Sequence, residues 1–273
     1  MPPDDIAERP RRLIHALGHE YGFERSVKLA PGAVRADRYV VSVHAGAFGD
    51  DPEPGLMQVL RALDLPGELE PRIQDAMRGC DVVHLGYEGT AAGPVFKVYL
   101  EHAAEARAAM ALPVPGHGVL VHLVLKWNAV SGAYNISRYV WPGDLDAAGV
   151  QRIIGSALSG APGDPGAVAF KAFDLLRGRT ADYFLLDVHD ETSPRRSFDL
   201  MLYGAGLLVS DLEQDLLALA GRWNVGAGLQ SALQSALRSA AGEALGHLSA
   251  GLSADGTPFA TFYYGAKGFT PKK

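Results

Sequence analysis

Four segments of the chain share one form, and this repeat constrains the fold more than any single motif does. Each segment opens as a strand, passes through a turn, which contains glycine in three of the four, and closes with a second strand that carries a tyrosine. The segments span residues 81–101, 119–141, 182–204 and 246–265, and a fainter copy lies at 23–46. Apolar and polar residues alternate along both strands of each copy, so each is predicted to be a β-hairpin.

Helical patterns fill the gaps between the hairpins. They cover residues 55–79 (broken at Leu65-Pro66-Gly67), 99–112, 144–160, 165–178, 209–225 and 228–246, and a leading helix covers 9–22. The chain therefore reads as five ββαα repeats. Hairpins joined in this order form an antiparallel sheet, and ten strands backed by helices close most simply into a barrel without exposed edges. We expect an α+β fold with a single domain over residues 1–273, in which residues 1–24 form a leading helix and a flexible N-terminus.

The composition of the chain argues against several classes of function. The 273 residues are 48% hydrophobic, enough for a sizeable core, and the net charge of -6 is opposite to that of a typical nucleic-acid binder. Cys80 is the only cysteine, which excludes an intramolecular disulfide. Neither a signal peptide nor a membrane-spanning run is recognisable. We expect a cytoplasmic monomer or homodimer that binds small molecules, not nucleic acid or membranes.

The alternation divides each strand into two faces. One face is apolar and suits packing against helices. The other collects charged and aromatic residues, which include His84, Glu88, Lys97, Tyr99, His122, Lys126, Tyr139, Asp187, His189, Asp199, Tyr203, His247 and Tyr263. An open sheet would expose this second face to solvent. A closed ten-stranded barrel would instead enclose it in a lumen wide enough to hold a ligand.

The stretch VFKVYL, residues 95–100, is the clearest local motif. Lys97 and Tyr99 are two residues apart, so on a strand they extend from the same face. The later hairpins have looser copies, SRYV, MLYG and FYYG, that place Tyr139, Tyr203 and Tyr263 at similar positions. Lys97 has no basic counterpart in the last two hairpins.

Hairpins of this kind, with FKVYL among them, resemble the aromatic prenyltransferases of the ABBA, or PT-barrel, superfamily over roughly residues 25–266. The resemblance implies transfer of a dimethylallyl-type group from a prenyl diphosphate to an electron-rich indole or phenol. It also implies that strand lysines and arginines bind the diphosphate and that tyrosines shield the allylic cation. Carried over by position, the diphosphate-binding candidates are Lys97, Lys126, Arg38 and Arg138, and the cation-shielding candidates are Tyr99, Tyr139, Tyr203 and Tyr263.

Two of these assignments leave choices open. Arg138 neighbours Tyr139, so both can face the lumen only if the strand contains a bulge. The proton lost from the aromatic acceptor needs a base, and Glu88, Asp187 and His84 are all predicted to face the lumen. Their spacing does not decide between them.

Two other functions fit the same pattern. The barrel could bind a ligand without cation chemistry, or luminal histidines (His84, His122, His247 and His189, with Asp187) could hold a catalytic metal. No H-x-H or H-E-x-x-H spacing supports a metal, so structural histidines are favoured. Two acidic strings, Asp4-Asp5-Glu8 and Asp211-Glu213-Asp215, lie in a terminus and in the first turn of a predicted helix. We therefore expect no metal site and no cofactor, magnesium included.

Overall fold

The computed structural model describes residues 5–111, 118–143, 145–180 and 182–271. Its strands are β1 (Tyr21–Ala30), β2 (Ala33–Arg35), β3 (Arg38–His44), β4 (Val82–Glu88), β5 (Val95–Glu101), β6 (Val119–Asn128), β7 (Tyr134–Trp141), β8 (Leu185–Asp190), β9 (Arg196–Met201), β10 (Leu245–Leu252) and β11 (Pro258–Phe269). Its α-helices are α1 (Arg9–Ala16), α2 (Pro52–Arg61), α3 (Glu70–Ala76), α4 (Ala103–Ala111), α5 (Ala147–Ala157), α6 (Gly166–Arg177), α7 (Glu213–Arg222) and α8 (Ala227–Ser239). Short 3-10 turns lie at Ile6–Glu8, Ala45–Phe48, Gly67–Leu69 and Val209–Asp211.

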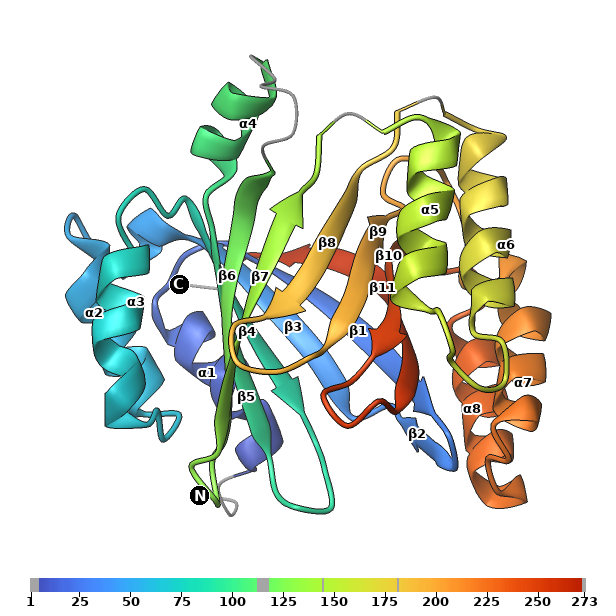
Figure 1. The fold of residues 1–273 in the computed structure, drawn as a ribbon. Helices are drawn as coiled ribbons and strands as arrows, with labels where there is room; N and C mark the ends of the chain where they lie inside the picture. Colours follow the sequence, from blue (N-terminus) through green and yellow to red (C-terminus); the bar gives the residue numbers. More distant parts are fainter. Residues whose placement is uncertain (1–4, 112–117, 144, 181, 272–273) are drawn as a thin grey trace.

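The strands form a closed antiparallel barrel (Figure 1). Neighbouring strands in the sequence pair in order, and β11 closes the ring by pairing with β1 from Tyr21↔Phe269 to Leu29↔Ala260. β2 and β3 both pair with β1, at Lys28–Ala30 and at Gly22–Arg25, so they act as one interrupted strand. Within the described residues the ring therefore has ten strand positions, which confirms the predicted barrel.

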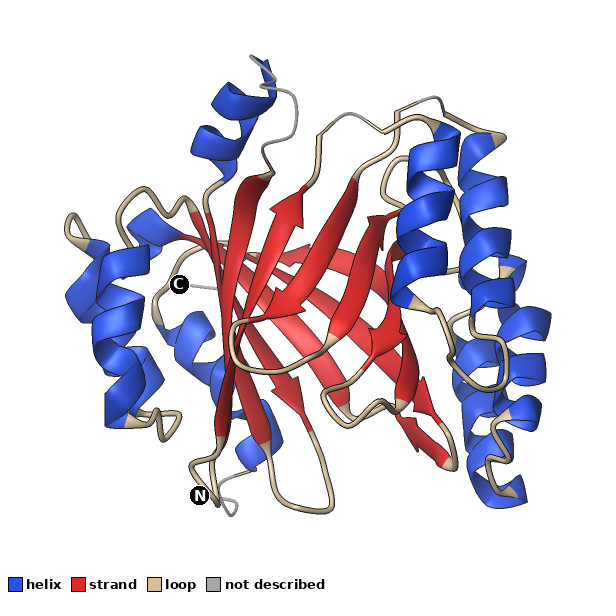
Figure 2. Ribbon diagram, in the orientation of Figure 1, coloured by secondary structure: helices blue, strands red, loops and turns tan. Residues whose placement is uncertain are grey.

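Helices cover the outside of the barrel on two sides (Figure 2). On one side α1, α2 and α3 pack over β3 to β6, where Leu60 and Trp127 belong to the same buried cluster. On the other, α5 to α8 pack over β8 to β11, with Phe173 and Phe198 at the centre. The break predicted at Leu65-Pro66-Gly67 separates α2 from α3. None of the helices in the described ranges is long and apolar enough to cross a membrane.

The second repeat departs from the ββαα pattern. Between β5 and β6 the described residues contain a single helix, α4, which stands at one end of the barrel instead of lying against its side (Figure 1). Ala103, Ala106 and Met110 of α4 line the opening of the barrel there. α1 begins where the leading helix was predicted, at Arg9, but it ends at Ala16, and Tyr21 and Gly22 at the end of the predicted helix belong to β1. Residues 1–4, part of the predicted flexible terminus, lie outside the described residues.

The predicted division into two faces holds on most strands but is wrong on β8. Leu185 packs in the core under the helices, whereas Leu186 and Val188 face the lumen and pack near Tyr139. The strand pairs Leu186 with Asp199, which also lines the lumen. Three consecutive apolar residues, Phe184 to Leu186, make both faces of β8 hydrophobic, so alternation could not fix which face turns inward.

Candidate active site

The lumen contains two cavities that meet at a ring of tyrosines. The cavity at the α4 end, which we call the upper cavity, has a volume of about 380 Å³. The cavity at the opposite end, which we call the basic end, measures about 140 Å³. Tyr99, Tyr139 and Tyr263 line both cavities and thus stand between them.

Cationic side chains from several strands gather in the basic end. It is lined by Lys28 of β1, Arg38 of β3, Lys97 of β5, Lys126 of β6 and Arg195 just before β9, with Arg35 more exposed beside them. Hydroxyl donors lie among these cations, since Ser249 and Thr261 line the same cavity. Such a concentration of donors in one cavity suits a multiply charged anion.

Glu88 is the carboxylate at the centre of this group. Its Oε2 lies 2.7 Å from Nζ of Lys97 and 3.4 Å from Nε of Arg38, and its Oε1 accepts a hydrogen bond of 2.8 Å from Arg35. Burial by itself would raise the pKa of Glu88, but the positive charges of Lys97 and Arg38 outweigh burial and hold the pKa well below its usual range. Glu88 is therefore a fixed anion that partly neutralises the cations.

The lysines of the basic end have pKa values below that of a free lysine. Burial lowers the pKa of Lys97 to about 8, although the Glu88 carboxylate opposes the change. Burial likewise lowers the pKa of Lys28 to about 7. The pKa of Lys126 also falls well below its usual value, through burial and the nearby charge of Arg195. A bound anion would reverse these shifts by stabilising the ammonium forms.

Neighbouring side chains hold three of the cations in place. Nζ of Lys126 donates to Oγ of Ser137 at 3.2 Å, and Ser137 donates to Asp190 at 2.6 Å. Asp190 also lies 3.7 Å from Arg195. Lys28 and Arg195 both lie over the ring of Phe259, at 4.6 and 5.2 Å from its centroid.

The tyrosine ring is aromatic and uncharged. The rings of Tyr99 and Tyr139 meet edge to face with centroids 5.9 Å apart. Burial raises the pKa of all three phenols, Tyr263 included, so they stay protonated at neutral pH. Three phenol rings at one level of the lumen form an aromatic wall between the basic end and the upper cavity.

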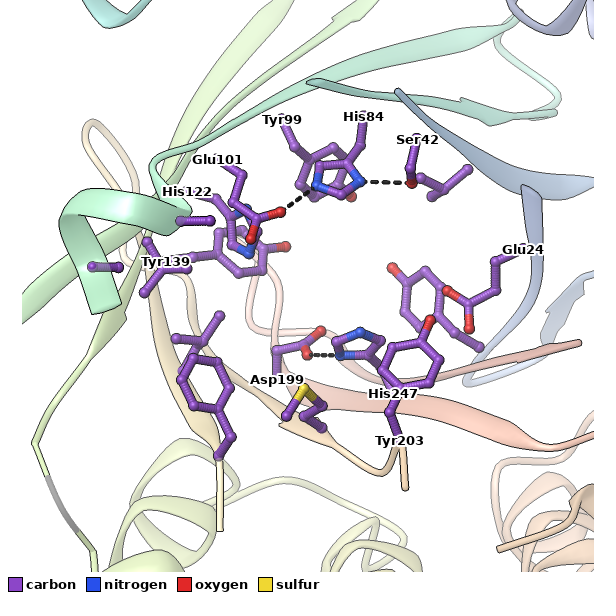
Figure 3. A pocket seen from close by; sticks show the side chains of 18 of the residues that line it. Glu24, Ser42, His84, Tyr99, Glu101, His122, Tyr139, Asp199, Tyr203 and His247 are labelled. Atoms are coloured by element: carbon purple, nitrogen blue, oxygen red, sulfur yellow. Dashed lines mark hydrogen bonds and ion pairs between the residues drawn. The ribbon is translucent and has the colours of Figure 1, made fainter. Parts of the chain in front are cut away.

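Two histidine–carboxylate pairs lie on opposite walls of the upper cavity (Figure 3). On one wall Nε2 of His84 lies 2.7 Å from Oε2 of Glu101, and Nδ1 of the same ring lies 2.7 Å from the hydroxyl of Ser42. On the other wall Nδ1 of His247 lies 2.6 Å from Oδ1 of Asp199. Burial opposes protonation of His247, but the Asp199 carboxylate outweighs burial and raises the pKa of the imidazole.

Glu24 and Tyr203 complete the wall beside His247. The Tyr203 ring packs edge to face on His247 with centroids 4.9 Å apart. Burial raises the pKa of the Glu24 carboxyl, and its Oε1 is buried without a hydrogen-bond partner. Gly246 leaves the space that Glu24 fills, since a Cβ at this position would lie 2.0 Å from Oε1 of Glu24.

His122 adjoins the first pair. Its ring meets those of His84 and Tyr139 edge to face, at centroid distances of 5.7 and 5.8 Å. Burial, with His84 adding to it, lowers the pKa of His122 to about 3, so this imidazole is neutral. Among the described residues, His84, Glu101 and His122 form a set with one potential ligand atom each, all within 4.8 Å of one another, that could hold a metal ion.

Comparison with known proteins identifies the architecture. No family model matches the sequence, and no curated protein does. Among solved structures, AnaPT from Neosartorya fischeri matches with a TM-score of 0.56 at 13% identity, over 92% of this chain and 79% of its own. NotF in complex with brevianamide F and DMSPP matches with a TM-score of 0.53 at 12% identity, over 89% and 79% of the two chains. A structure of the NotF prenyltransferase gives 0.51 at 12% identity, over 89% and 80%.

The chain has the PT-barrel fold. Its two cavities and the tyrosines between them occupy the lumen of this PT barrel, where the sequence placed the ligand chamber. Because the sequence identities are only 12–13%, these matches show the shared architecture and nothing about the chemistry. The chemistry has to be argued from the residues of this chain.

The PT barrel brings together most of the residues selected from the sequence. Lys97, Lys126 and Arg38 line the basic end, and Tyr99, Tyr139 and Tyr263 form the tyrosine ring. Tyr203 lies in the upper cavity, 43% exposed. The two base candidates His84 and Glu88 lie at different ends, since His84 lines the upper cavity and Glu88 lines the basic end.

Two selected residues do not reach the lumen cavities. Asp187 was expected to face inward, but its side chain is 44% exposed beside His189, because β8 turns its other face inward. Arg138 is 42% exposed and lies 3.6 Å from Glu191. The bulge of the β6–β7 pair lies in β6, between Leu120 and His122, whereas β7 pairs without interruption from Arg138 to Val140, so Arg138 stays on the face opposite to Tyr139.

Several residues of the site were not selected from the sequence. Lys28, Arg195, Glu24, Glu101 and Asp199 all line one of the two cavities. Asp199 could have been selected from the sequence, because the alternation along residues 198–202 predicts that its side chain faces the lumen. Arg195 had no such signal, since it lies in the polar turn ETSPR, residues 191–195, between β8 and β9.

Proposed function

We propose that this PT barrel is an aromatic prenyltransferase that moves a dimethylallyl-type group from a prenyl diphosphate to an electron-rich indole or phenol. The observation that carries the proposal is the basic end directly beneath the tyrosine ring. Six basic side chains line this end, whereas Glu88 is the one carboxylate among its lining residues, so basic groups outnumber acidic ones where a diphosphate would bind. Where the basic end meets the upper cavity, the residues that line both are the aromatic Tyr99, Tyr139 and Tyr263 and no charged side chain.

The basic end would promote ionisation of the allylic diphosphate. As the carbon–oxygen bond breaks, both electrons leave with the diphosphate, and negative charge grows on its oxygens. Lys97, Lys28 and Arg38 would stabilise this charge with donors already in position. Because these side chains supply the positive charge, we propose that the ionisation needs no magnesium.

The tyrosine ring would receive the allylic cation. Tyr99, Tyr139 and Tyr263 present neutral phenol rings, which stabilise a carbocation by cation–π attraction. The same rings limit the access of water that would quench the cation. An aromatic carbon of the acceptor, held in the upper cavity, would then attack the cation and form the new carbon–carbon bond.

The proton lost from the acceptor ring would go to a base of the upper cavity. His247 with Asp199 and His84 with Glu101 both line that cavity (Figure 3). Glu88 is a weaker choice, because its carboxylate is locked among cations at the basic end and its pKa is strongly depressed. We therefore assign Glu88 to organising the cations and the base to a histidine of the upper cavity.

The structural neighbours support the substrate classes. NotF, a protein of the same fold, forms a complex with brevianamide F and DMSPP. In the present chain the upper cavity is lined by Glu24, Glu101 and Asp199, of which Glu24 has an unpartnered oxygen. A neutral acceptor with N–H or O–H donors fits this lining better than an acceptor that carries a carboxylate.

A thermal-melt experiment tests the proposal. Dimethylallyl thiolodiphosphate, which resists ionisation, is expected to raise the melting temperature of the protein, because it binds only the folded state. Lys97→Ala should abolish the shift, whereas Lys171→Ala, which removes an exposed lysine of α6, should leave it unchanged. The proposal fails if prenyl diphosphates of C5 to C15 chain length all leave the melting curve unchanged.

A further inference from the structure

His84, Glu101 and His122 come together on one wall of the upper cavity. They lie on three successive strands, β4, β5 and β6. Glu101 pairs directly with His122, and His84 pairs with Tyr99, two residues before Glu101. Because residues two apart on a strand share a face, the three side chains extend from the same side of the sheet.

The immediate surroundings orient two of these side chains. The hydroxyl of Ser42 binds Nδ1 of His84 at 2.7 Å, which leaves Nε2 of His84 directed at Glu101. Hydrogen bonds of this kind fix the ring orientation of metal-binding histidines. The bulge in β6 next to His122 breaks the regular strand geometry at this point.

His122 has an unused polar atom. Its Nδ1 is buried and makes no hydrogen bond. Buried polar atoms normally have a partner, and this imidazole lies beside a second histidine and a carboxylate, so a ligand bound by the three residues would supply one. Aromatic rings, His84 and Tyr139 among them, hold the His122 imidazole edge to face.

We propose that His84, Glu101 and His122 bind a divalent first-row transition-metal ion. Two imidazoles and one carboxylate are the donor set that Zn²⁺, Fe²⁺ and Co²⁺ accept, whereas Mg²⁺ prefers oxygen ligands. Bonds of about 2.0 to 2.2 Å keep ligand atoms roughly 3 to 3.6 Å apart. The present separations, between 2.7 Å and 4.8 Å, bracket that range, so small side-chain rotations suffice.

The ion would occupy a place distinct from the diphosphate site. Its three protein ligands line the upper cavity, and the tyrosine ring separates them from the basic end. Three protein ligands leave coordination positions free, as in catalytic zinc sites. An oxygen or nitrogen of a molecule in the upper cavity would fill such a position. This inference departs from the expectation that the chain uses no metal, and it does not depend on the proposed transferase activity.

Titration with Co²⁺ tests the site without any organic substrate. The protein, freed of any affinity tag, is expected to bind one equivalent of Co²⁺ with a visible absorption band, and Zn²⁺ should displace it. His122→Gln and Glu101→Gln are expected to weaken binding at least about tenfold, since each removes a ligand and keeps a side chain of similar size. Melting curves of the metal-free variants check that they fold.

Two control variants make the result specific. His247→Gln changes a histidine of the opposite wall, and His189→Gln changes an exposed one beside Asp187. Both should bind Co²⁺ like the wild type. Binding that is absent, or that survives His122→Gln and Glu101→Gln, overturns the proposal. Because the melting shift with dimethylallyl thiolodiphosphate reports on the basic end, failure of the metal site and failure of the proposed function can be told apart.

Discussion

Nζ of Lys97 lies 2.7 Å from Oε2 of Glu88, and both side chains are buried. The two residues belong to facing strands of one hairpin, where Gly86 pairs with Lys97 and Glu88 lies two residues further along. Gly86 eases the packing of Lys97, because a Cβ there would lie 3.3 Å from Cβ of Lys97, a tight contact. The pair thus pre-positions the lysine while the site is empty.

Replacing Glu88 by glutamine should have opposite effects on the free and the bound protein. Loss of the carboxylate leaves the charge of Lys97 uncompensated, so the free protein should lose about 3 to 5 kcal/mol of stability. Inorganic pyrophosphate should then raise the melting temperature more in the variant than in the wild type, because the anion supplies the missing charge. Equal shifts in the two proteins would contradict the role assigned to Glu88.

Binding of the anion should depend on pH through the lysines of the basic end. The pKa values of Lys28 and Lys97, about 7 and about 8, lie below the value of 10.5 that a free lysine has. The unfolded chain therefore holds more protons than the folded one between pH 7 and about 10.5, so these lysines make the empty protein more stable as the pH rises. Anion affinity should change in the other direction and fall as the pH rises above 7, by up to about tenfold per unit for each group.

Calorimetry in buffers of different ionisation enthalpy can check this linkage. At pH 8 the binding of pyrophosphate should take up protons, and Lys28→Arg should reduce the uptake because an arginine stays charged. Proton uptake that is absent in the wild type, or equal in the two proteins, would show that Lys28 is not titrating in the site.

The orientation of β8 gives a matched pair of substitutions. Asp187→Asn changes an exposed side chain outside the lumen, so product formation should stay within about twofold of the wild type. Asp199→Asn removes the partner of His247 and should lower the rate at least about tenfold, with a shift in the pH profile. A product assay at several pH values compares the two. The reverse order of effects would mean that β8 faces the other way.

Trp127 should be important for stability and not for chemistry. Its ring is 1% exposed in the core beneath α2, and its Nε1 donates a hydrogen bond of 2.8 Å to the carbonyl of Leu63. Trp127→Phe leaves that carbonyl without its donor and opens a cavity, at a cost of about 2 to 4 kcal/mol. Urea unfolding measures the loss, and Tyr134→Phe, at an exposed position, is the control that should change little.

The parts of the site that could be predicted are those controlled by alternation along a single strand. Lys97, Tyr99, Tyr139 and Tyr263 each follow or precede an apolar residue that has to face the helices, so their own direction is fixed. Arg195 shows the limit of this reasoning. It lies in a turn, where no alternation exists, and its place beside Lys28 depends on closure of the barrel.

The sequence by itself determined the hairpins, the helices between them and which residues of most strands share a face, because these properties depend on neighbours within a few residues. Only the tertiary structure decided which strands end up facing each other across the lumen. Closure between β1 and β11 brings Lys28 and Arg195 to the basic end, and the register of β8 against β9 turns Asp187 outward. These outcomes follow from pairing between distant segments, for which two-residue periodicity gives no information.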